Sequence, residues 1–189
     1  GQLLKFKRLL SHSSNRIIAD IGCGDGYLIK ALKGRFSHYY AIEPSQVFEK
    51  IPKLENVTIK NESFEQLSIA DNSIDVVLLS SVIQMVNNDK LLIKQCNRIL
   101  KKNGVLILSA PVDYLLIKPW YKYIYRFFRF FKKGIPSDYH GFLDYINNNY
   151  NNSRGFYQPE EIKEILHAQG FKVESEFYSP GYIVSTIHD

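Results

Sequence analysis

Short apolar runs alternate with helical patterns over the first two thirds of the chain. Four of these runs are rich in Ile, Val and Leu and are apolar on both faces, which is typical of strands that helices cover on both sides. The predicted strands are Ile17–Ile21, Tyr39–Ile42, Ile74–Leu79 and Val105–Leu108, with Val57–Lys60 as a weaker fifth. This alternation predicts an α/β domain with a parallel sheet.

Helical periodicity fills two of the intervening stretches, Tyr27–Leu32 and Asp89–Leu100. The second has its apolar residues on one stripe, and the pair Asn103-Gly104 after it is typical of a helix stop. A third helix is predicted to begin at Gln158 and to stop at Gly170, because proline and two acidic residues occupy its first turn.

Two final apolar runs, Phe171–Phe177 and Tyr182–Ile187, are too closely linked for a parallel crossover and predict an antiparallel hairpin. The length of 189 residues fits one domain, residues 1–189, with one continuous core. Between about residues 112 and 156 the regular pattern breaks, and an aromatic and basic stretch gives way to an Asn-rich one. That segment is predicted to be an insertion in the domain.

Composition excludes several classes of protein. With 45% hydrophobic and 23% charged residues, the chain can bury enough apolar surface to offset its ordering entropy, so it is not intrinsically disordered. Its two cysteines, Cys23 and Cys96, can form neither a disulfide framework nor a four-ligand zinc site, and no metal site is expected. The low cysteine content also suits a reducing compartment and favours the cytoplasm. A run of about 18 apolar residues occurs nowhere, so the sequence predicts neither a membrane span nor a signal peptide.

The most informative stretch has the sequence IADIGCGDGYLIKAL. A buried strand runs through Asp20 into Gly22-Cys23-Gly24 and on into a helix, and the alternating glycines let the backbone turn sharply and approach a ligand. Glu43 follows the next strand, at the end where a carboxylate can accept hydrogen bonds from both hydroxyls of a ribose. Together these features predict a site for an adenosine-type cofactor.

A nicotinamide dinucleotide is one alternative. Its Gly-x-Gly-x-x-Gly fingerprint would need a third glycine where this chain has Tyr27, whose side chain would crowd a pyrophosphate. The Asp-x-Gly-x-Gly-x-Gly pattern instead resembles the first motif of the class I S-adenosylmethionine-dependent methyltransferases, and the resemblance extends from about residue 15 to the end of the chain. It implies S-adenosylmethionine as cofactor and S-adenosylhomocysteine as product. The implied fold is an α/β, Rossmann-like three-layer sandwich with a seven-stranded, mostly parallel sheet and a C-terminal antiparallel hairpin.

The resemblance assigns roles to the glycine loop and its acidic partner. Gly22, Cys23 and Gly24 resemble the turn beneath the methionine portion of the cofactor. Asp20 is expected to anchor this loop or the cofactor's amino group, and Glu43 resembles the ribose-binding acid. Cys23 could be considered as a nucleophile, but no neighbouring residue supplies a base, so we interpret it as a small packing residue.

Later positions complete the predicted cofactor site. Ser63 stands where many family members have an Asp that contacts the adenine amino group, and it can still form a hydrogen bond. Phe64 stands where a backbone N–H meets the adenine ring. The run Ser80-Ser81-Val82-Ile83-Gln84-Met85 resembles the loop after the fourth strand that lines the cofactor, and Ser80 and Ser81 begin it.

The resemblance implies an enzyme that transfers a methyl group to a small-molecule or lipid-linked acceptor. Positioning can supply most of this catalysis, so a general base is optional. His140, in the inserted segment, is the best-placed histidine for that role, and a loop histidine without chemistry is the alternative.

The loop after the fourth predicted strand bears on the acceptor. Enzymes of this fold that methylate base amino groups usually carry Asn or Asp, two prolines and an aromatic residue there, whereas this chain has Ser80-Ser81-Val82-Ile83. The loop therefore argues against base amino groups as acceptors and excludes no other RNA chemistry, and nucleic acid is the less favoured partner. Three alternatives stay open: a non-catalytic binding module of the same fold, an NAD-binding oxidoreductase and an RNA methyltransferase.

The net charge of +5 comes from one segment. Residues 114–136 hold six of the 24 basic residues and no acidic ones, which leaves 18 basic against 19 acidic residues elsewhere. Five of the six recur at helical spacing within an arc of about 80°, opposite an aromatic face. They are Lys118, Lys122, Arg126, Arg129 and Lys133. An amphipathic helix over residues 118–133 predicts peripheral contact with a membrane, and a solvated lid helix or an RNA-binding stretch are the alternatives.

Overall fold

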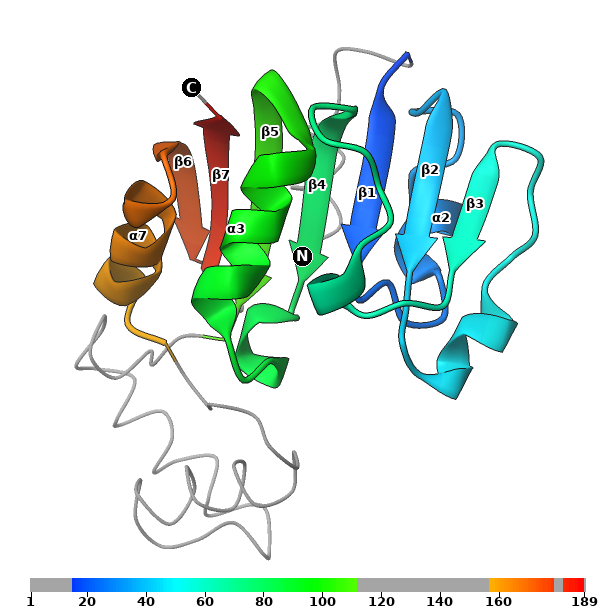
Figure 1. Ribbon diagram of the computed structural model, residues 1–189, viewed down its shortest axis with the longest axis horizontal. Helices are drawn as coiled ribbons and strands as arrows, with labels where there is room; N and C mark the ends of the chain where they lie inside the picture. The colour runs from blue at the N-terminus through cyan, green and yellow to red at the C-terminus, as the bar shows by residue number, and fades with distance from the viewer. Residues whose placement is uncertain (1–14, 112–156, 179–181, 189) are drawn as a thin grey trace, which may run out of the picture.

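The computed structural model describes residues 15–111, 157–178 and 182–188. Seven strands of these residues form one sheet in the order β3-β2-β1-β4-β5-β7-β6 (Figure 1). The strands are β1 Ile17–Ile21, β2 His38–Ile42, β3 Val57–Lys60, β4 Ile74–Ser80, β5 Leu100–Ala110, β6 Phe171–Tyr178 and β7 Tyr182–His188. Each strand predicted from the apolar pattern is present, and the largest difference in bounds is at the start of β5.

The strands β1 to β5 are parallel to one another. Strand β7 is antiparallel to both of its neighbours, β5 and β6. The α/β class, the mostly parallel sheet and the terminal antiparallel hairpin are therefore confirmed. Because β7 is antiparallel to both β5 and β6, strand β6 runs in the same direction as β1 to β5.

Helices cover both faces of this sheet. Helices α3 (Asp89–Ile99) and α7 (Pro159–Ala168) lie in front of it in Figure 1, and α2 (Tyr27–Ala31) lies behind it. Successive residues of a strand point to opposite faces, so Ala19 packs with the cluster of α3 and α7 while Ile18 packs with the cluster of α2. The result is the expected three-layer arrangement.

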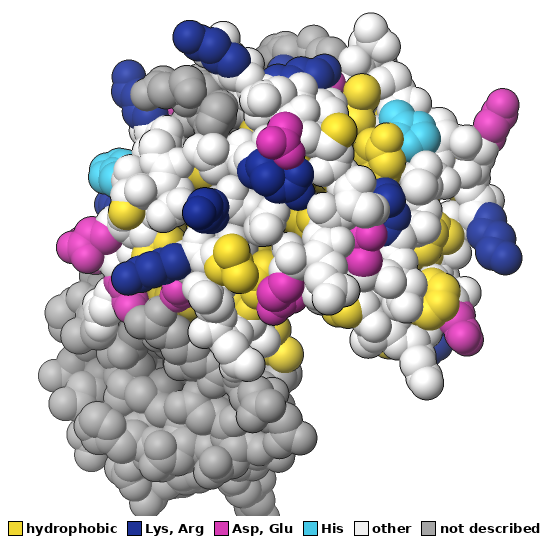
Figure 2. Space-filling model, in the orientation of Figure 1, with side chains coloured by type: hydrophobic (Ala, Val, Ile, Leu, Met, Phe, Trp, Pro, Cys, Tyr) yellow, Lys and Arg dark blue, Asp and Glu magenta, His cyan; other side chains and the backbone are white. Residues whose placement is uncertain are grey.

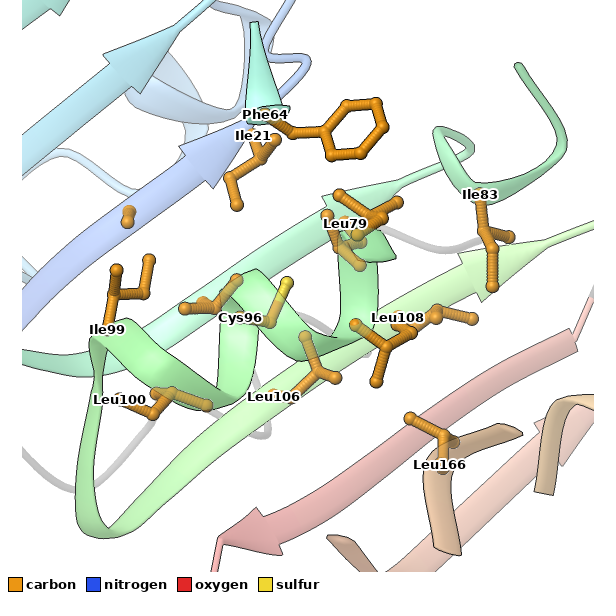
Figure 3. Close-up of a cluster of buried hydrophobic side chains, with 14 of the residues drawn as sticks. Ile21, Phe64, Leu79, Ile83, Cys96, Ile99, Leu100, Leu106, Leu108 and Leu166 are labelled. Atoms are coloured by element: carbon orange, nitrogen blue, oxygen red, sulfur yellow. The ribbon is translucent and has the colours of Figure 1, made fainter. Parts of the chain in front are cut away.

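The larger of the two hydrophobic clusters also holds two short 3-10 helices, η2 (Phe64–Gln66) and η3 (Ile83–Met85). Figure 3 shows Phe64 beside Ile21, and Ile83 directed from η3 into the cluster. Burial of a large apolar side chain stabilises a fold by about 1.5–3 kcal/mol. The same core that stabilises the domain therefore also fixes these two helices near the carboxyl ends of the strands.

The start of β5 corrects one prediction. Helix α3 ends at Ile99 and the strand begins at the next residue, so the pair Asn103-Gly104 is not the stop of that helix. The pair lies where the register of β4 against β5 shifts. Asn103 has a left-handed φ of 61°, and a Cβ at Gly104 would lie 2.7 Å from the carbonyl oxygen of Lys101. The Asn-Gly pair did indicate left-handed backbone, but it forms an irregularity within a strand.

The strand order reverses at β1, because the chain continues to β2 on one side of it while β4 and β5 lie on the other. In open parallel sheets, ligands bind beyond the carboxyl ends of the strands at such a point. The glycine loop follows β1 and the turn at Ser81 follows β4, so both reach this edge. The fold therefore places the predicted cofactor residues where a ligand is expected.

Three predictions fall outside the described residues: the inserted segment at about 112–156, its amphipathic helix over 118–133, and His140. Among the residues that the structure does describe, no helix has both the length and the apolar character needed to cross a membrane.

Candidate cofactor site

A cavity of about 530 Å³ opens at the carboxyl edge of the sheet. Its walls are the glycine loop after β1, the residues after β2, the start of η2 and the turn after β4. Five of the residues predicted to bind the cofactor line it: Gly22, Glu43, Ser63, Phe64 and Ser81. The fold thus gathers into one cavity residues that the sequence places in four separate motifs.

Gly22 lies where two walls of the cavity meet. Its φ is +72°, a left-handed conformation that glycine adopts at little cost. A Cβ at this position would lie 2.6 Å from Cγ2 of Val82, in the turn after β4. The loop after β1 and the turn after β4 therefore approach each other so closely that only glycine fits between them.

The N–H groups of the glycine loop are already engaged. Gly22 and Cys23 donate to the carbonyl oxygen of Ile42 at 2.8 and 3.1 Å. Gly24 donates to Oε2 of Glu43 at 2.9 Å. A dinucleotide-binding loop directs such groups at a pyrophosphate, whereas here a carbonyl and a carboxylate take them and the carboxylate would repel a second anion. This geometry argues against the nicotinamide alternative.

The carboxylate of Glu43 connects the glycine loop after β1 with the residues that follow β2. It is 9% exposed and follows the end of β2, and its Oε1 accepts the N–H of Ser45 at 3.0 Å. The backbone oxygen of Glu43 accepts the Nδ2 group of Asn61 at 2.9 Å, which fixes the residue in place. An ionised carboxylate has about four lone-pair sites. Two are used by Gly24 and Ser45, so the carboxylate can still accept from hydroxyl groups in the cavity.

Ser63 and Phe64 line the cavity at the start of η2. Ser63 immediately precedes η2, and its side chain makes no capping hydrogen bond to that helix. Its hydroxyl is therefore not committed to the helix that it precedes. The ring of Phe64 packs in the core (Figure 3), which holds the backbone of η2 against the cavity.

Asp20 lies below the glycine loop rather than in the cavity wall. It is fully buried, and the hydroxyl of Tyr39 donates to its Oδ2 at 2.6 Å, while its Oδ1 is buried with no hydrogen-bond partner. Burial raises the pKa of Asp20 to about 7, the bond from Tyr39 opposes that rise, and the charge of Glu43 adds to it. Burial and the neighbouring Asp20 raise the pKa of Tyr39 as well. This pair joins β1 to β2 directly beneath the loop.

Comparison with known proteins decides the family. Residues 19–108 match the family described as Methyltransferase domain. They form a class I S-adenosylmethionine-dependent methyltransferase domain. A protein of Mycolicibacterium smegmatis named as an S-adenosylmethionine-dependent methyltransferase is 28% identical over 111 residues, which are 56% of this chain and 42% of that protein. The chain thus spans less than half the length of this relative.

Two further matches, one by sequence and one by structure, extend the comparison. Ribosomal RNA-processing protein 8 of Arabidopsis thaliana is 29% identical over 101 residues, 53% of this chain and 31% of that protein. A solved S-adenosylmethionine-dependent methyltransferase from Mesorhizobium loti has a TM-score of 0.72 with 13% identity, and the match covers 100% of this chain and 98% of that one. The second match concerns the fold alone.

The cavity of the methyltransferase domain fits S-adenosylmethionine, the cofactor of this family. That molecule carries a ribose diol, and the carboxylate of Glu43 can still accept hydrogen bonds from its two hydroxyl groups. It has no pyrophosphate, for which the glycine loop would have few free N–H donors. The left-handed turn at Gly22 leaves backbone rather than side chain on the side of the loop that faces the cavity.

The other predicted cofactor residues lie around the cavity without lining it. Cys23 and Gly24 belong to the loop, and Ser80 is the last residue of β4. Burial raises the pKa of the Cys23 thiol, and the charges of Asp20 and Glu43 raise it further. The thiol therefore stays protonated, in agreement with a packing residue and not with a nucleophile. Burial raises the pKa of Cys96 in the same way.

The role of Tyr39 could not be predicted from the sequence. Its hydroxyl donates to Asp20, but an aromatic residue is ordinary in a buried strand and nothing in the pattern distinguishes it. Val82 and Met85 belong to the loop that the sequence predicts to line the cofactor, and both line the cavity, Met85 while 49% exposed. The contact of Val82 with Gly22 could not be predicted, because a left-handed glycine indicates a close neighbour but not which residue it is.

Proposed function

We propose that the whole protein is an S-adenosylmethionine-dependent methyltransferase that acts on a small-molecule or lipid-linked acceptor. One observation carries the proposal. The buried carboxylate of Glu43 lines the same cavity as the left-handed Gly22, at the point where the strand order reverses. A carboxylate can bind the ribose hydroxyls, and a glycine beside it lets the backbone come close to the ligand, so this pair suits a ribosyl cofactor without phosphates.

Each residue of the cavity then has a role toward the cofactor. S-adenosylmethionine supplies a methyl group on a sulfonium, and its transfer to an acceptor is an in-line displacement. Glu43 accepts hydrogen bonds from the ribose hydroxyls. The hydroxyl of Ser63 and the backbone N–H of Phe64 face the adenine edge, and Gly22 lets the backbone approach the methionine portion. Ser80 and Ser81 position the wall after β4.

Asp20, Cys23 and Gly24 act from beneath the cavity. Gly24 orients the carboxylate of Glu43 through its N–H group, and Asp20 anchors the loop through the sheet. Cys23 fills the space between them as a neutral thiol. The fold thus prepares the positions of the binding groups before any ligand enters, which is how positioning lowers a barrier.

The acceptor class rests on the turn after β4 and on the charge distribution. The turn begins with Ser81 and Val82, without the Pro-Pro-aromatic sequence typical of enzymes that methylate base amino groups. On the face shown in Figure 2, basic side chains of the described residues are scattered among acidic and hydrophobic ones. Contact of residues 118–133 with a membrane surface and a base role for His140 remain predictions, as does a cytoplasmic location.

Binding of S-adenosylhomocysteine, measured by calorimetry and by thermal shift, tests the cofactor. The wild-type protein should bind and be stabilised, with no stabilisation by NAD. Glu43→Ala removes the acceptor for two hydroxyls and should weaken binding at least about 10-fold, since hydrogen bonds to a charged group contribute about 1.5–3 kcal/mol. Glu49→Ala, an exposed acid in η1 (Gln46–Lys50), is the matched control. Equal affinity of the Glu43→Ala and Glu49→Ala variants would rule out this site.

Turnover with labelled S-adenosylmethionine tests the acceptor. The panel should hold prenylated quinone precursors, glycolipids, small hydroxylated and amine metabolites, and structured RNA, because one relative is named for ribosomal RNA processing. Methylation of a small or lipid-linked compound supports the proposal. Methylation of RNA alone would replace the acceptor class, and tight cofactor binding without any turnover would favour a non-catalytic binding module.

A further inference from the structure

The turn after β4 forms one wall of the cavity although no glycine or charge of its own fixes it there. Ser81 has a left-handed φ of 58°, which is uncommon for a residue with a side chain. Its N–H donates to Ser109 on β5, both to the carbonyl oxygen at 3.0 Å and to the hydroxyl at 3.1 Å. Ser109 thus holds the first residue of the turn. The lining residues Val82 and Met85 come after it. Burial of Ile83 and a hydrogen bond from the N–H of Met85 to the carbonyl oxygen of Val82 at 2.8 Å hold this part of the turn locally.

Tyr157 adds a further contact to the middle of this wall from a distant part of the chain. Its side chain is 1% exposed, and its hydroxyl lies 3.2 Å from the carbonyl oxygen of Ile83 and 3.0 Å from Oδ2 of Asp89. Ile83 is flanked in sequence by the lining residues and is itself fully buried. The hydroxyl of Tyr157 therefore contacts the backbone in the middle of the wall.

The backbone of Tyr157 is fixed independently of its side chain. Its N–H donates to the carbonyl oxygen of Pro111 at 3.2 Å, just beyond the end of β5. Residues 111 and 157 flank the predicted insertion, so the chain leaves β5 and returns toward α7 at one point. The side chain of Tyr157 connects that point to the wall of the cavity.

We propose that Tyr157 is a positioning residue for the cofactor cavity, whose hydroxyl holds η3 in place from the junction of residues 111 and 157. The proposal rests on the function proposed above, since it concerns the same cavity. A phenol has one proton to donate, and Ile83 and Asp89 share it. Loss of this hydroxyl leaves the carbonyl of Ile83 buried without that donor, and the wall that contains Val82 and Met85 is free to shift.

The single methionine of the sequence gives a direct probe of this wall. Met85 lines the cavity, so a ¹³C-methyl label on methionine gives one NMR signal that reports on its position. Tyr157→Phe keeps the ring and removes only the hydroxyl. The signal of free Tyr157→Phe should shift or broaden relative to wild type. Tyr40→Phe is the control, because it also removes one tyrosine hydroxyl, here from a half-buried residue of β2 that does not line the cavity.

Affinity for S-adenosylhomocysteine gives the second readout. Tyr157→Phe should weaken binding about 3- to 10-fold, the effect of one lost buried hydrogen bond, with Tyr40→Phe unchanged. A folded Tyr157→Phe protein with an unchanged Met85 signal and wild-type affinity would overturn the proposal. If the wild type itself does not bind, the proposed function fails, and the Met85 signal of the free proteins still decides whether Tyr157 holds the wall.

Asp89→Asn decides the matter if Tyr157→Phe does not fold. This variant leaves the hydroxyl of Tyr157 in place and removes the charged acceptor that competes with Ile83 for its proton. The proposal then requires affinity within about twofold of wild type, because the bond to Ile83 persists. A 10-fold loss of affinity in folded Asp89→Asn would mean that the carboxylate, and not the tyrosine hydroxyl, supports the wall.

Discussion

The loop after β1 and the turn after β4 are two adjoining walls of the cavity, and different parts of the chain hold each of them. The loop is held by its own backbone, through N–H groups that bond to Ile42 and Glu43 within the next strand and its end. The turn has backbone bonds too, from Ser81 to the carbonyl oxygen of Ser109 and from Met85 to that of Val82, but it also depends on side chains from far away, Ser109 on β5 and Tyr157 before α7. The two walls meet where Gly22 touches Val82.

This difference separates cofactor recognition from the rest of the site. A wall built by backbone hydrogen bonds depends on glycines and on one carboxylate, which leave a recognisable motif. A wall held by distant side chains can be built from different residues in different proteins, so it leaves no recognisable motif in the sequence. Substitutions on the first wall should therefore act through backbone strain and charge, and those on the second wall through the loss of single hydrogen bonds.

The largest effect is expected where the walls meet. Gly22→Ala places a methyl group 2.6 Å from Val82 in left-handed backbone, whereas Gly24→Ala has the same kind of backbone and no heavy atom within 4 Å of the new methyl group. Left-handed strain costs about 1–2 kcal/mol and overpacking about 1–3 kcal/mol more. Urea unfolding should show about 2–5 kcal/mol lost in Gly22→Ala and only the strain in Gly24→Ala. Equal losses would show that the walls do not meet at Gly22.

A smaller, pH-dependent effect is expected beneath the loop. The pKa of Asp20 is about 7 in the folded chain and 3.8 for an ordinary aspartate, so the folded state holds an extra proton between these values. The free energy of unfolding should therefore fall as the pH rises through this interval, by up to about 1.4 kcal/mol per pH unit. Asp20→Asn, which can still accept from Tyr39, should abolish this decline. Parallel stability curves for the two proteins between pH 4 and 7 would contradict the buried, protonated state.

The smallest effect is expected on the second wall. Ser109→Ala removes the hydroxyl that accepts from Ser81 and leaves the carbonyl oxygen at 3.0 Å in place. The loss of one of two acceptors should lower the free energy of unfolding by about 1 kcal/mol and move the Met85 methyl signal. Ser37→Ala, at an exposed serine before β2, serves as the control. A loss as large as that of Gly22→Ala would mean that the second wall is as strictly constrained as the first.

Most of the fold could be predicted from apolar periodicity, because parallel strands covered on both faces form continuous runs of Ile, Val and Leu. The start of β5 could not. Asn103-Gly104 indicates left-handed backbone in either a helix stop or a strand irregularity, and only pairing with β4 distinguishes the two. Local sequence specifies the conformation of such a pair but not its partner.

The residues of the candidate site also fall into those that local sequence predicts and those that it does not. Gly22, Glu43 and Ser81 could be placed from their positions after strands, because parallel strands bring their carboxyl ends to one edge. Tyr39 and Tyr157 could not, since nothing in a buried aromatic residue shows which carboxylate or carbonyl its hydroxyl will reach. Their roles depend on contacts between segments far apart in sequence, and these exist only in the folded chain.

The hydrogen bond between Pro111 and Tyr157 also bears on how the protein can vary or be engineered. Since the two backbones already touch, a short linker in place of residues 112–156 would join β5 to α7 without moving either element, and a longer one would cost little more closure entropy. Libraries of replacement segments could therefore be grafted at this junction, and the unchanged methyl signal of Met85 would identify the grafts that leave the cavity intact.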